Sequence, residues 1–253
     1  MSKRSTRVPS TTNEMLLEVS KLSSWYGSAR ILFDVDFNIR RGEVVALMGR
    51  NGAGKSTTFL TLMGMMDRRS GIVRFMGQDI SEIPIYRIAK IGLGFVPEDR
   101  RIFTDLTVAE NLDIGLQPPR SWPDGSPLHT WTPEGLYEVF PNLAERRNSS
   151  AGRMSGGEQQ MLTIARTLMG NPYLVLLDEP SEGVAPVIVE QMARMILKMK
   201  EAGVSILLSE QNIHFARHVS DRVYMLEKGH ITWTGSMEDL THNPDISLKY
   251  LSV

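Results

Sequence analysis

The sequence Gly49-Arg50-Asn51-Gly52-Ala53-Gly54-Lys55-Ser56 has the form G-x-x-x-x-G-K-S. Residues 44–48, directly before it, form an apolar run typical of a buried strand, and residues 55–65 show the apolar spacing of a helix. A glycine-rich loop between a strand and a helix presents backbone N–H groups and a lysine, which together bind phosphate groups. The stretch therefore predicts a nucleotide-binding phosphate loop.

The residue types in this loop fit a nucleoside triphosphate bound with Mg²⁺. Glycines let the backbone close around the phosphates, and Lys55 supplies a cation for the β- and γ-phosphates. The Ser56 hydroxyl is expected to join the Mg²⁺ coordination shell. The residues expected to contact the nucleotide are Gly49, Arg50, Asn51, Gly52, Ala53, Gly54, Lys55, Ser56 and Thr57.

Two acidic residues follow a second apolar run, at residues 174–177. Asp178 is expected to hold Mg²⁺ through water, and Glu179 is expected to orient the attacking water or act as its base. Acids at a strand end can also be ordinary solvated caps. The phosphate loop in the same chain favours the catalytic interpretation.

Further apolar runs predict strands that alternate with helices, which indicates an α/β fold with crossover connections. The runs 174–177 and 206–208 are apolar on both faces, as in central parallel strands. The expected strands are residues 16–19, 31–39, 44–48, 72–75, 93–96, 174–177, 204–208, 223–226 and 231–233, and the expected helices are residues 55–65, 108–116, 156–169, 187–200 and 213–219.

The chain is expected to form a disordered basic tail over residues 1–14 and a single domain over residues 15–253. Residues 86–167 are mainly helical in pattern and are interpreted as a subdomain inserted into the sheet domain. Within them, residues 117–133 contain five prolines and two tryptophans. Because prolines interrupt a long helix, this segment is expected to be a surface loop.

Composition excludes several classes of protein. The net charge of −1 argues against a nucleic-acid partner bound through a global basic field, and the absence of cysteine excludes disulfides and thiolate metal sites. The five histidines show no ligand spacing. No apolar run reaches the length of a membrane span, so any membrane role is expected to come through a partner.

A second glycine pair lies in the run Met154-Ser155-Gly156-Gly157-Glu158-Gln159-Gln160 and opens a predicted helix. A helix start with bare N–H groups is an anion site. Two such sites far apart in one chain suggest that the second serves a nucleotide held by another subunit. The run resembles the L-S-G-G-Q signature of ATP-binding-cassette (ABC) ATPases, with Met154 in place of Leu and Glu158 in place of Gln.

The resemblance covers residues 16–251 and implies a P-loop fold with a RecA-like mixed sheet core, an antiparallel β subdomain and an inserted helical signature subdomain. It also implies that two cassettes pair head to tail and hold ATP with Mg²⁺ between them. The phosphate loop of one cassette then faces the signature of the other. Residues Ser155, Gly156, Gly157 and Glu158 of this chain are thereby expected to contact the partner's nucleotide.

Three further positions correspond to known places in the family pattern. Tyr26 matches the aromatic residue that stacks on adenine, with Trp25 as a rival. Glu98 stands where the family usually has Gln and is expected to act in catalysis and as a Mg²⁺ ligand. Gln211 stands where the family usually has His. An amide cannot ionise, and Glu98 adds negative charge beside a triphosphate, so the pocket of this chain is expected to be the weaker of two unequal sites.

The branch within the family is suggested by Glu98, the run Ser181-Glu182-Gly183-Val184-Ala185-Pro186 and the run Ser209-Glu210-Gln211-Asn212. Together they resemble one ATPase subunit of branched-chain amino-acid importers, the LivF type. That resemblance implies a different second ATPase, two transmembrane permease subunits, an indirectly associated solute-binding protein and a peripheral position on the cytoplasmic face of the inner membrane.

Other functions stay open from the sequence. Importers of urea or amides are similar, and Gln211 leaves room for a weakly hydrolysing regulatory cassette. A cassette acting on DNA or ribosomes would usually carry twin cassettes or basic extensions, which are absent from this sequence. The Ser155–Gly157 signature and the lack of an N-K-x-D loop argue against a kinase or GTPase.

Overall fold

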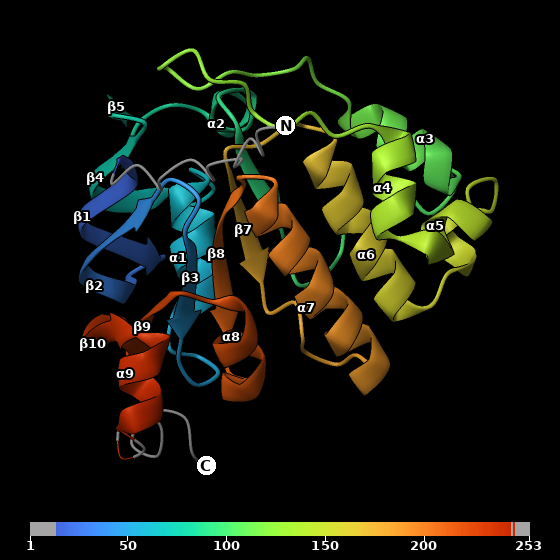
Figure 1. Ribbon diagram of the computed structural model, residues 1–253. Helices are drawn as coiled ribbons and strands as arrows, with labels where there is room; N and C mark the ends of the chain where they lie inside the picture. Colours follow the sequence, from blue (N-terminus) through green and yellow to red (C-terminus); the bar gives the residue numbers. More distant parts are fainter. Residues whose placement is uncertain (1–13, 244, 246–253) are drawn as a thin grey trace, which may run out of the picture.

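Two sheets organise the computed structural model, which describes residues 14–243 and residue 245 (Figure 1). The larger sheet has six strands in the order β10-β9-β3-β8-β7-β6, and all but β10 run parallel to their neighbours. Its strands are β3 (Val44–Met48), β6 (Leu93–Val96), β7 (Leu174–Asp178), β8 (Ser205–Glu210), β9 (Arg222–Glu227) and β10 (His230–Ser236).

The central strands of this sheet are buried on both faces, as their continuous apolar sequences predict. Along β3, Val44, Ala46 and Met48 belong to one apolar core, whereas Val45 and Leu47 belong to a second core on the other face. The first core is completed by α6 (Gly156–Leu168), α7 (Pro186–Glu201) and α8 (Ile213–Val219). The second is completed by α1 (Lys55–Leu62) and the smaller sheet.

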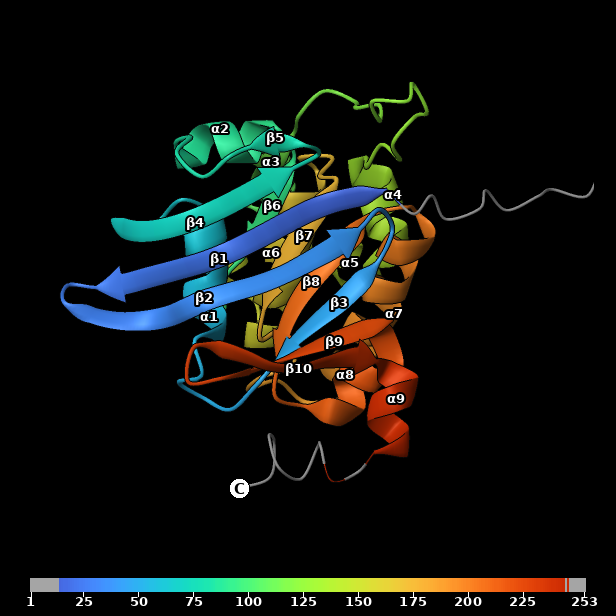
Figure 2. The ribbon, with the colours of Figure 1, turned by 90° about the vertical axis from the view of Figure 1, so that its left-hand side faces the viewer.

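The smaller sheet is antiparallel, with the order β2-β1-β4-β5. It consists of β1 (Met15–Tyr26), β2 (Ala29–Arg40), β4 (Arg68–Phe75) and β5 (Gln78–Asp79). Figure 2 shows it as a layer in front of α1, so α1 lies between the two sheets. The α/β P-loop fold with an added antiparallel sheet, expected from the sequence, is therefore confirmed.

The helices beside α6 form a separate group at one end of the large sheet (Figure 1). They are α3 (Val108–Gly115), α4 (Pro133–Val139), α5 (Pro141–Glu145) and the short 3₁₀ turn η1 (Ala151–Arg153). The helical insertion was expected to begin near Tyr86. In the structure α2 (Ile85–Lys90) packs beside β6, and β6 pairs with β7 within the sheet, so the inserted helices begin after Val96.

Two expected strands extend well beyond their expected bounds, since β1 runs to Tyr26 rather than residue 19 and β4 begins at Arg68 rather than residue 72. Strand β5 and helices α2, α4, α5 and α9 (Met237–His242) were not predicted, because each is too short for a period to emerge. Helix α1 ends at Leu62 rather than residue 65, since Gly64 takes a φ of 69° that stops the helix. Residues 1–13 of the expected tail lie outside the described residues.

The proline-rich segment carries no helix between Leu116 and Thr132 and is fastened to the sheets by its own side chains. The Arg41 guanidinium lies 4.0 Å from the centre of the buried Trp122 ring and 2.7 Å from an Asp124 carboxylate oxygen. Tyr173, which precedes β7, donates its hydroxyl to the carbonyl of Ser121. These contacts join the segment to both the β2–β3 turn and the large sheet.

Candidate functional site

The carboxyl ends of β3, β7 and β8 meet at one edge of the large sheet, where Met48 is paired with Glu210 and Asp178 with Ser209. A pocket of about 480 Å³ opens beside this edge. It is lined by Tyr26, Ile31, Asn51, Gly52, Gly54, Lys55, Ser56, Thr57, Glu98, Glu179 and Glu182. Sheet register therefore brings together residues that are more than 150 positions apart in the chain.

The phosphate loop turns from β3 into α1 through two residues with positive φ, Gly52 at 77° and Gly54 at 110°. The N-terminus of α1 has no capping side chain and no acid in its first turn, so the helix itself supplies no anion to its free N–H groups. Lys55 is only 3% exposed, and its ammonium donates to the carbonyls of Gly49 (2.8 Å) and Arg50 (3.1 Å). The loop fits an anionic ligand.

Asp178 lies at the end of β7 with two hydroxyls directed at one carboxylate oxygen. Ser56 donates to Oδ1 at 3.2 Å and Ser209 donates to the same atom at 2.6 Å. Burial raises the pKa of Asp178, and the bonds from Ser209 and Ser56 offset part of that rise. The carboxylate and the Ser56 hydroxyl form an oxygen pair of the kind that Mg²⁺ prefers.

Glu179, the next residue, is held in an unusual backbone conformation with φ of 46°. Its N–H donates to the Ser209 hydroxyl at 2.9 Å, and its carboxylate lies 2.9 Å from Lys55 Nζ. A left-handed non-glycine residue costs about 1–3 kcal/mol and persists where its surroundings fix it, often at a functional site. Here the fixed backbone directs the carboxylate into the pocket.

The turn after β8 joins three loops of the site. Gln211 Nε2 donates to Asn51 Oδ1 of the phosphate loop at 2.7 Å. The buried carboxylate of Glu210 accepts from the N–H groups of Ser181 (3.0 Å) and Asn212 (3.2 Å). Burial raises the pKa of Glu210, and these hydrogen bonds act against the rise. A hydrogen bond between side chains thereby links the phosphate loop to the turn after β8.

The structure separates the two aromatic candidates for a base-stacking role. Tyr26 lines the pocket and is 52% exposed. The ring of Trp25 instead lies near the guanidinium groups of Arg30 (5.3 Å) and Arg68 (4.7 Å). Glu98 follows β6, is exposed and stands in the pocket wall, so its carboxylate faces the space in front of Ser56 and Thr57.

None of the residues 155–158 lines this pocket. Ser155 instead caps α6: its side chain accepts from the Glu158 N–H, and Glu158 Oε2 accepts from the Ser155 N–H at 2.8 Å. The other Glu158 oxygen pairs with Arg146 at 2.9 Å. Gly157 packs against Ile188 of α7, where a β-carbon would come within 2.9 Å. One chain alone thus presents the phosphate loop and the glycine pair at separate places.

The predicted site residues did not include Ser209, Glu182 or Ile31, although Ser209 and Glu182 stand in runs that the family resemblance singled out. Ser209 bridges Asp178 and Glu179 by hydrogen bonds, and Glu182 lines the pocket. Ser209 could have been found from its place at the end of an apolar strand, since carboxyl ends of neighbouring parallel strands share one edge. Among the described residues, no three His, Cys, Asp or Glu side chains cluster closely enough to hold a metal by themselves.

Comparison with known proteins identifies the family. The model for the family described as "ABC transporter" matches residues 32–182, from β2 through the phosphate loop, the signature and the Asp178 strand. The chain belongs to the ABC transporter family. It is an ABC ATPase, in which nucleotide hydrolysis is coupled to transport.

The relatives of this ABC cassette align over nearly its full length. A high-affinity branched-chain amino acid transport ATP-binding protein, BraG of Pseudomonas aeruginosa, is 42% identical over 93% of this chain and 99% of its own length. The lipopolysaccharide export system ATP-binding protein LptB of Haemophilus influenzae is 33% identical over 93% of this chain and 97% of its own. No described helix of the cassette has the length and apolar character needed to cross a bilayer.

Solved structures agree with this fold. A nucleotide-free ATP-binding cassette from an ABC transporter superposes with a TM-score of 0.77 at 27% identity, covering 93% of this chain and 97% of that one. The ADP conformation of another ABC-transporter cassette gives a TM-score of 0.75 at 26% identity, with 93% and 96% covered. These structures are ATP-binding cassettes, and the phosphate loop described above is the corresponding nucleotide-binding element of this chain.

Proposed function

We propose that this cassette is the ATP-hydrolysing subunit of an importer for branched-chain or other hydrophobic amino acids. The observation that carries the proposal is the 42% identity with BraG over 99% of that protein's length. The residues that suggested this branch also converge in space, because Glu98 and Glu182 line one pocket and Gln211 is bonded to its phosphate loop. LptB matches less closely, at 33%.

In the proposed chemistry, Lys55 and the N–H groups of α1 bind the ATP phosphates, and Tyr26 stacks on adenine. Mg²⁺ would be held by Ser56, by Asp178 through water and by Glu98, and would supply charge neutralisation on the phosphates. Glu179 orients and deprotonates the attacking water, from a backbone position fixed by Ser209. Gln211 reports the state of the phosphate loop through Asn51.

The glycine pair serves a second cassette. Ser155 is exposed, Gly156 and Glu158 are half-buried and Gly157 is buried, at a helix start away from the chain's own pocket. This position fits a role at a nucleotide held by a partner ATPase. We infer a heterodimer with two unequal sites, in which the signature lent by this chain completes the more active one. Glu98 and Gln211 weaken the site that contains Lys55.

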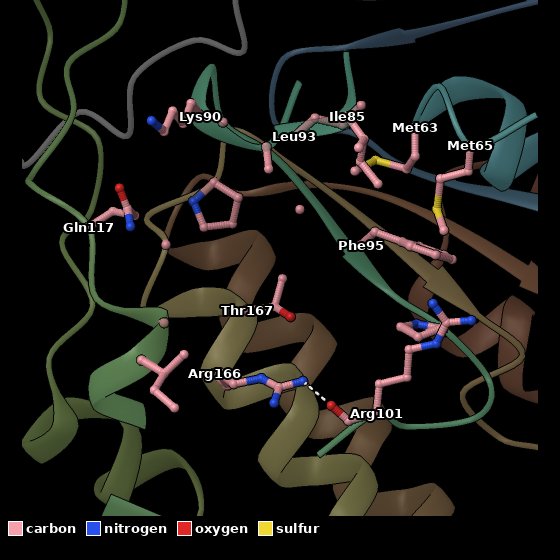
Figure 3. A pocket seen from close by; sticks show the side chains of 18 of the residues that line it. Met63, Met65, Ile85, Lys90, Leu93, Phe95, Arg101, Gln117, Arg166 and Thr167 are labelled. Atoms are coloured by element: carbon pink, nitrogen blue, oxygen red, sulfur yellow. Dashed lines mark hydrogen bonds between the residues drawn. The ribbon is translucent and has the colours of Figure 1, made fainter. Parts of the chain in front are cut away.

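A second, largely apolar groove of about 450 Å³ fits the membrane partner (Figure 3). Figure 3 shows side chains of β6 (Leu93, Phe95) and α6 (Arg166, Thr167) around one hollow. Ile85, Phe103 and Ile114 are exposed large apolar residues in its lining. A cytoplasmic helix of one permease subunit would fill this groove, and the partner cassette would hold the helix of the second permease subunit. This arrangement places the cassette on the cytoplasmic face of the inner membrane. A solute-binding protein would deliver the cargo from the other side.

Uptake measurements test the assigned cargo class. Cells lacking this chain should lose high-affinity uptake of labelled leucine, isoleucine and valine, and the wild-type chain should restore it whereas Lys55→Ala should not. Restored uptake of urea or acetamide without leucine would replace the proposal by the related urea or amide importer. Uptake that survives Lys55→Ala, with weak ATPase activity of the purified complex, would support a regulatory cassette.

The inequality of the two sites has its own experiment. Glu179→Gln and the matching substitution in the partner ATPase are introduced separately into the purified complex. The partner substitution should abolish most of the steady-state ATPase activity, because that site uses the signature of this chain. Equal losses from the two substitutions would show equivalent sites and overturn this part of the proposal.

A further inference from the structure

The side chain of Arg100 lies directly against the first glycine of the signature. A β-carbon built on Gly156 would be 2.7 Å from Arg100 Nη1 and 3.1 Å from its Cζ and Nη2. Any side chain at position 156 would therefore displace the guanidinium. Gly156 has a φ outside the left-handed region, so a side chain at this position would disturb the contact with Arg100 and not the backbone conformation.

Two hydrogen bonds from the signature helix hold the turn Arg100–Arg101, one to the carbonyl of each residue. Arg100 and Arg101 have φ values of 66° and 48°, which is unfavourable for two consecutive non-glycine residues. Thr163 Oγ1 donates to the Arg100 carbonyl at 2.6 Å, and Arg166 Nη2 donates to the Arg101 carbonyl at 2.6 Å (Figure 3). Both donors belong to α6, so the turn that carries Arg100 is bonded to the signature helix.

The charge on Arg100 is not neutralised by any carboxylate in the part of the chain that the structure describes. Within the described residues no carboxylate pairs with it: Asp99 is paired with Arg101, and Glu158 is bonded to Arg146 and to the Ser155 N–H. The N-terminus of α6 carries a partial positive charge, so a fixed cation at this end is unfavourable in the isolated chain. The same arrangement is favourable once an anion with several negative charges is bound there.

We propose that Arg100 is a phosphate-binding residue of the nucleotide site that this chain completes for its partner. The inference rests on the proposed function, in which Ser155–Gly157 face the partner's ATP. The guanidinium would contact the terminal phosphate with paired N–H donors, beside the N–H groups of α6. Arg100 thereby adds a full positive charge beside a helix start whose own charged side chain, Glu158, is already bonded to Arg146 and to the Ser155 N–H.

Site-resolved nucleotide trapping tests this role in the assembled transporter, purified through a tag on this chain. The complex is incubated with 8-azido-ATP, Mg²⁺ and vanadate, then illuminated, and the label on each ATPase subunit is measured. Label on the partner reports the site completed by Ser155 and Arg100, and label on this chain reports the site of Lys55. The second label controls for folding in the same sample.

Arg100→Gln should lower the label on the partner at least about tenfold, because a charge-assisted phosphate contact is lost, and should leave the label on this chain within about twofold. Arg100→Lys should retain an intermediate level, since charge remains without the planar fork. Arg153→Gln is the matched control, because Arg153 is exposed and lies three residues before Gly156. It should change neither label.

Three outcomes would overturn the inference. In the first, Arg100→Gln and Arg153→Gln give the same label on the partner, whereas Ser155→Ala lowers it. That result would show that Arg100 does not bind the nucleotide, although the shared site exists. A parallel loss of both labels in Arg100→Gln would mean that the side chain only supports the fold. If Ser155→Ala also left the label on the partner unchanged, the shared site itself would be wrong, and the role of Arg100 with it.

Discussion

The ammonium of Lys55 lies 2.9 Å from a carboxylate oxygen of Glu179, and both side chains are more than nine-tenths buried. The group proposed to bind phosphate and the group proposed to activate water therefore neutralise each other. A γ-phosphate in the pocket would take over the ammonium and free the carboxylate for water. The Glu179 carboxylate and the γ-phosphate would thus compete for the same ammonium.

Glu179→Gln is predicted to slow hydrolysis by about 10²–10⁴-fold, because the proposed base is lost. Breaking one side of a buried ion pair costs about 3–5 kcal/mol, so the nucleotide-free variant should also melt at a lower temperature. A non-hydrolysable ATP analogue restores negative charge beside Lys55 and should raise Tm more in the variant than in the wild type. Differential scanning fluorimetry checks this, with Glu182→Gln as an exposed control from the same pocket.

Ser209→Ala is predicted to move the acid side of the ATPase pH profile to higher pH. The Ser209 hydroxyl lowers the pKa of Asp178 against the larger effect of burial, so its removal raises that pKa further. More Mg²⁺ should then be needed at mildly acidic pH. Ser205→Ala is the control, because Ser205 is equally buried on β8 but bonds only the Gly42 N–H within the described contacts. Identical profiles for the two variants would contradict the prediction.

The raised pKa of Asp178 also fixes the sign of its effect on stability. The folded chain binds this proton more tightly than the unfolded chain, so the contribution is fully present below the ordinary aspartate pKa. It is lost as pH rises through the raised value. In Ser209→Ala the loss should extend to higher pH, which urea unfolding at a series of pH values measures.

Much of this site could be predicted from sequence because its parts end strands. The phosphate loop follows β3 and Asp178 ends β7, and apolar strands with fixed register bring their carboxyl ends to one edge. Side-chain direction was harder to predict. Trp25 contacts the guanidinium groups of two arginines, and Ser209 donates a hydrogen bond to Asp178. These contacts join separate segments, so no local sequence pattern predicts them.

Short elements and strained turns could not be predicted for a related reason. Helices α4 and α5 span seven and five residues, too few for apolar periodicity. The left-handed pair Arg100–Arg101 has no glycine or asparagine to mark it, and it is maintained by bonds from α6. Tertiary contacts override local preference at both places.

Gln211→His is predicted to give the weaker site a titration that the wild type lacks. An imidazole can replace the amide as donor to Asn51, and it ionises near pH 6.5, whereas the amide does not ionise. ATPase rates are measured between about pH 5.5 and pH 8, the range in which a histidine side chain titrates. The partner's site is inactivated for this measurement. His214→Gln, which removes an exposed imidazole one turn away, should leave the profile unchanged. If the ratio of the ATPase rates of Gln211→His and the wild type did not change with pH, the prediction would be wrong.

Arg41→Ala is predicted to loosen the proline-rich segment without changing the nucleotide site. The guanidinium lies over the buried Trp122 ring, a contact worth about 1–2 kcal/mol, whereas its exposed pair with Asp124 adds little. The bonds from Ser126 and then Arg41 lower the pKa of Asp124 to about 2, and the variant should raise it only in part, because Ser126 remains. Urea unfolding measures the loss of stability, and limited proteolysis should show new cleavage between residues 117 and 132. Arg40→Ala is the control, because the Arg40 side chain is exposed beside Arg41, and this variant should be cleaved like the wild type. If both variants resisted proteolysis equally, Trp122 and Tyr173 would hold the segment without Arg41.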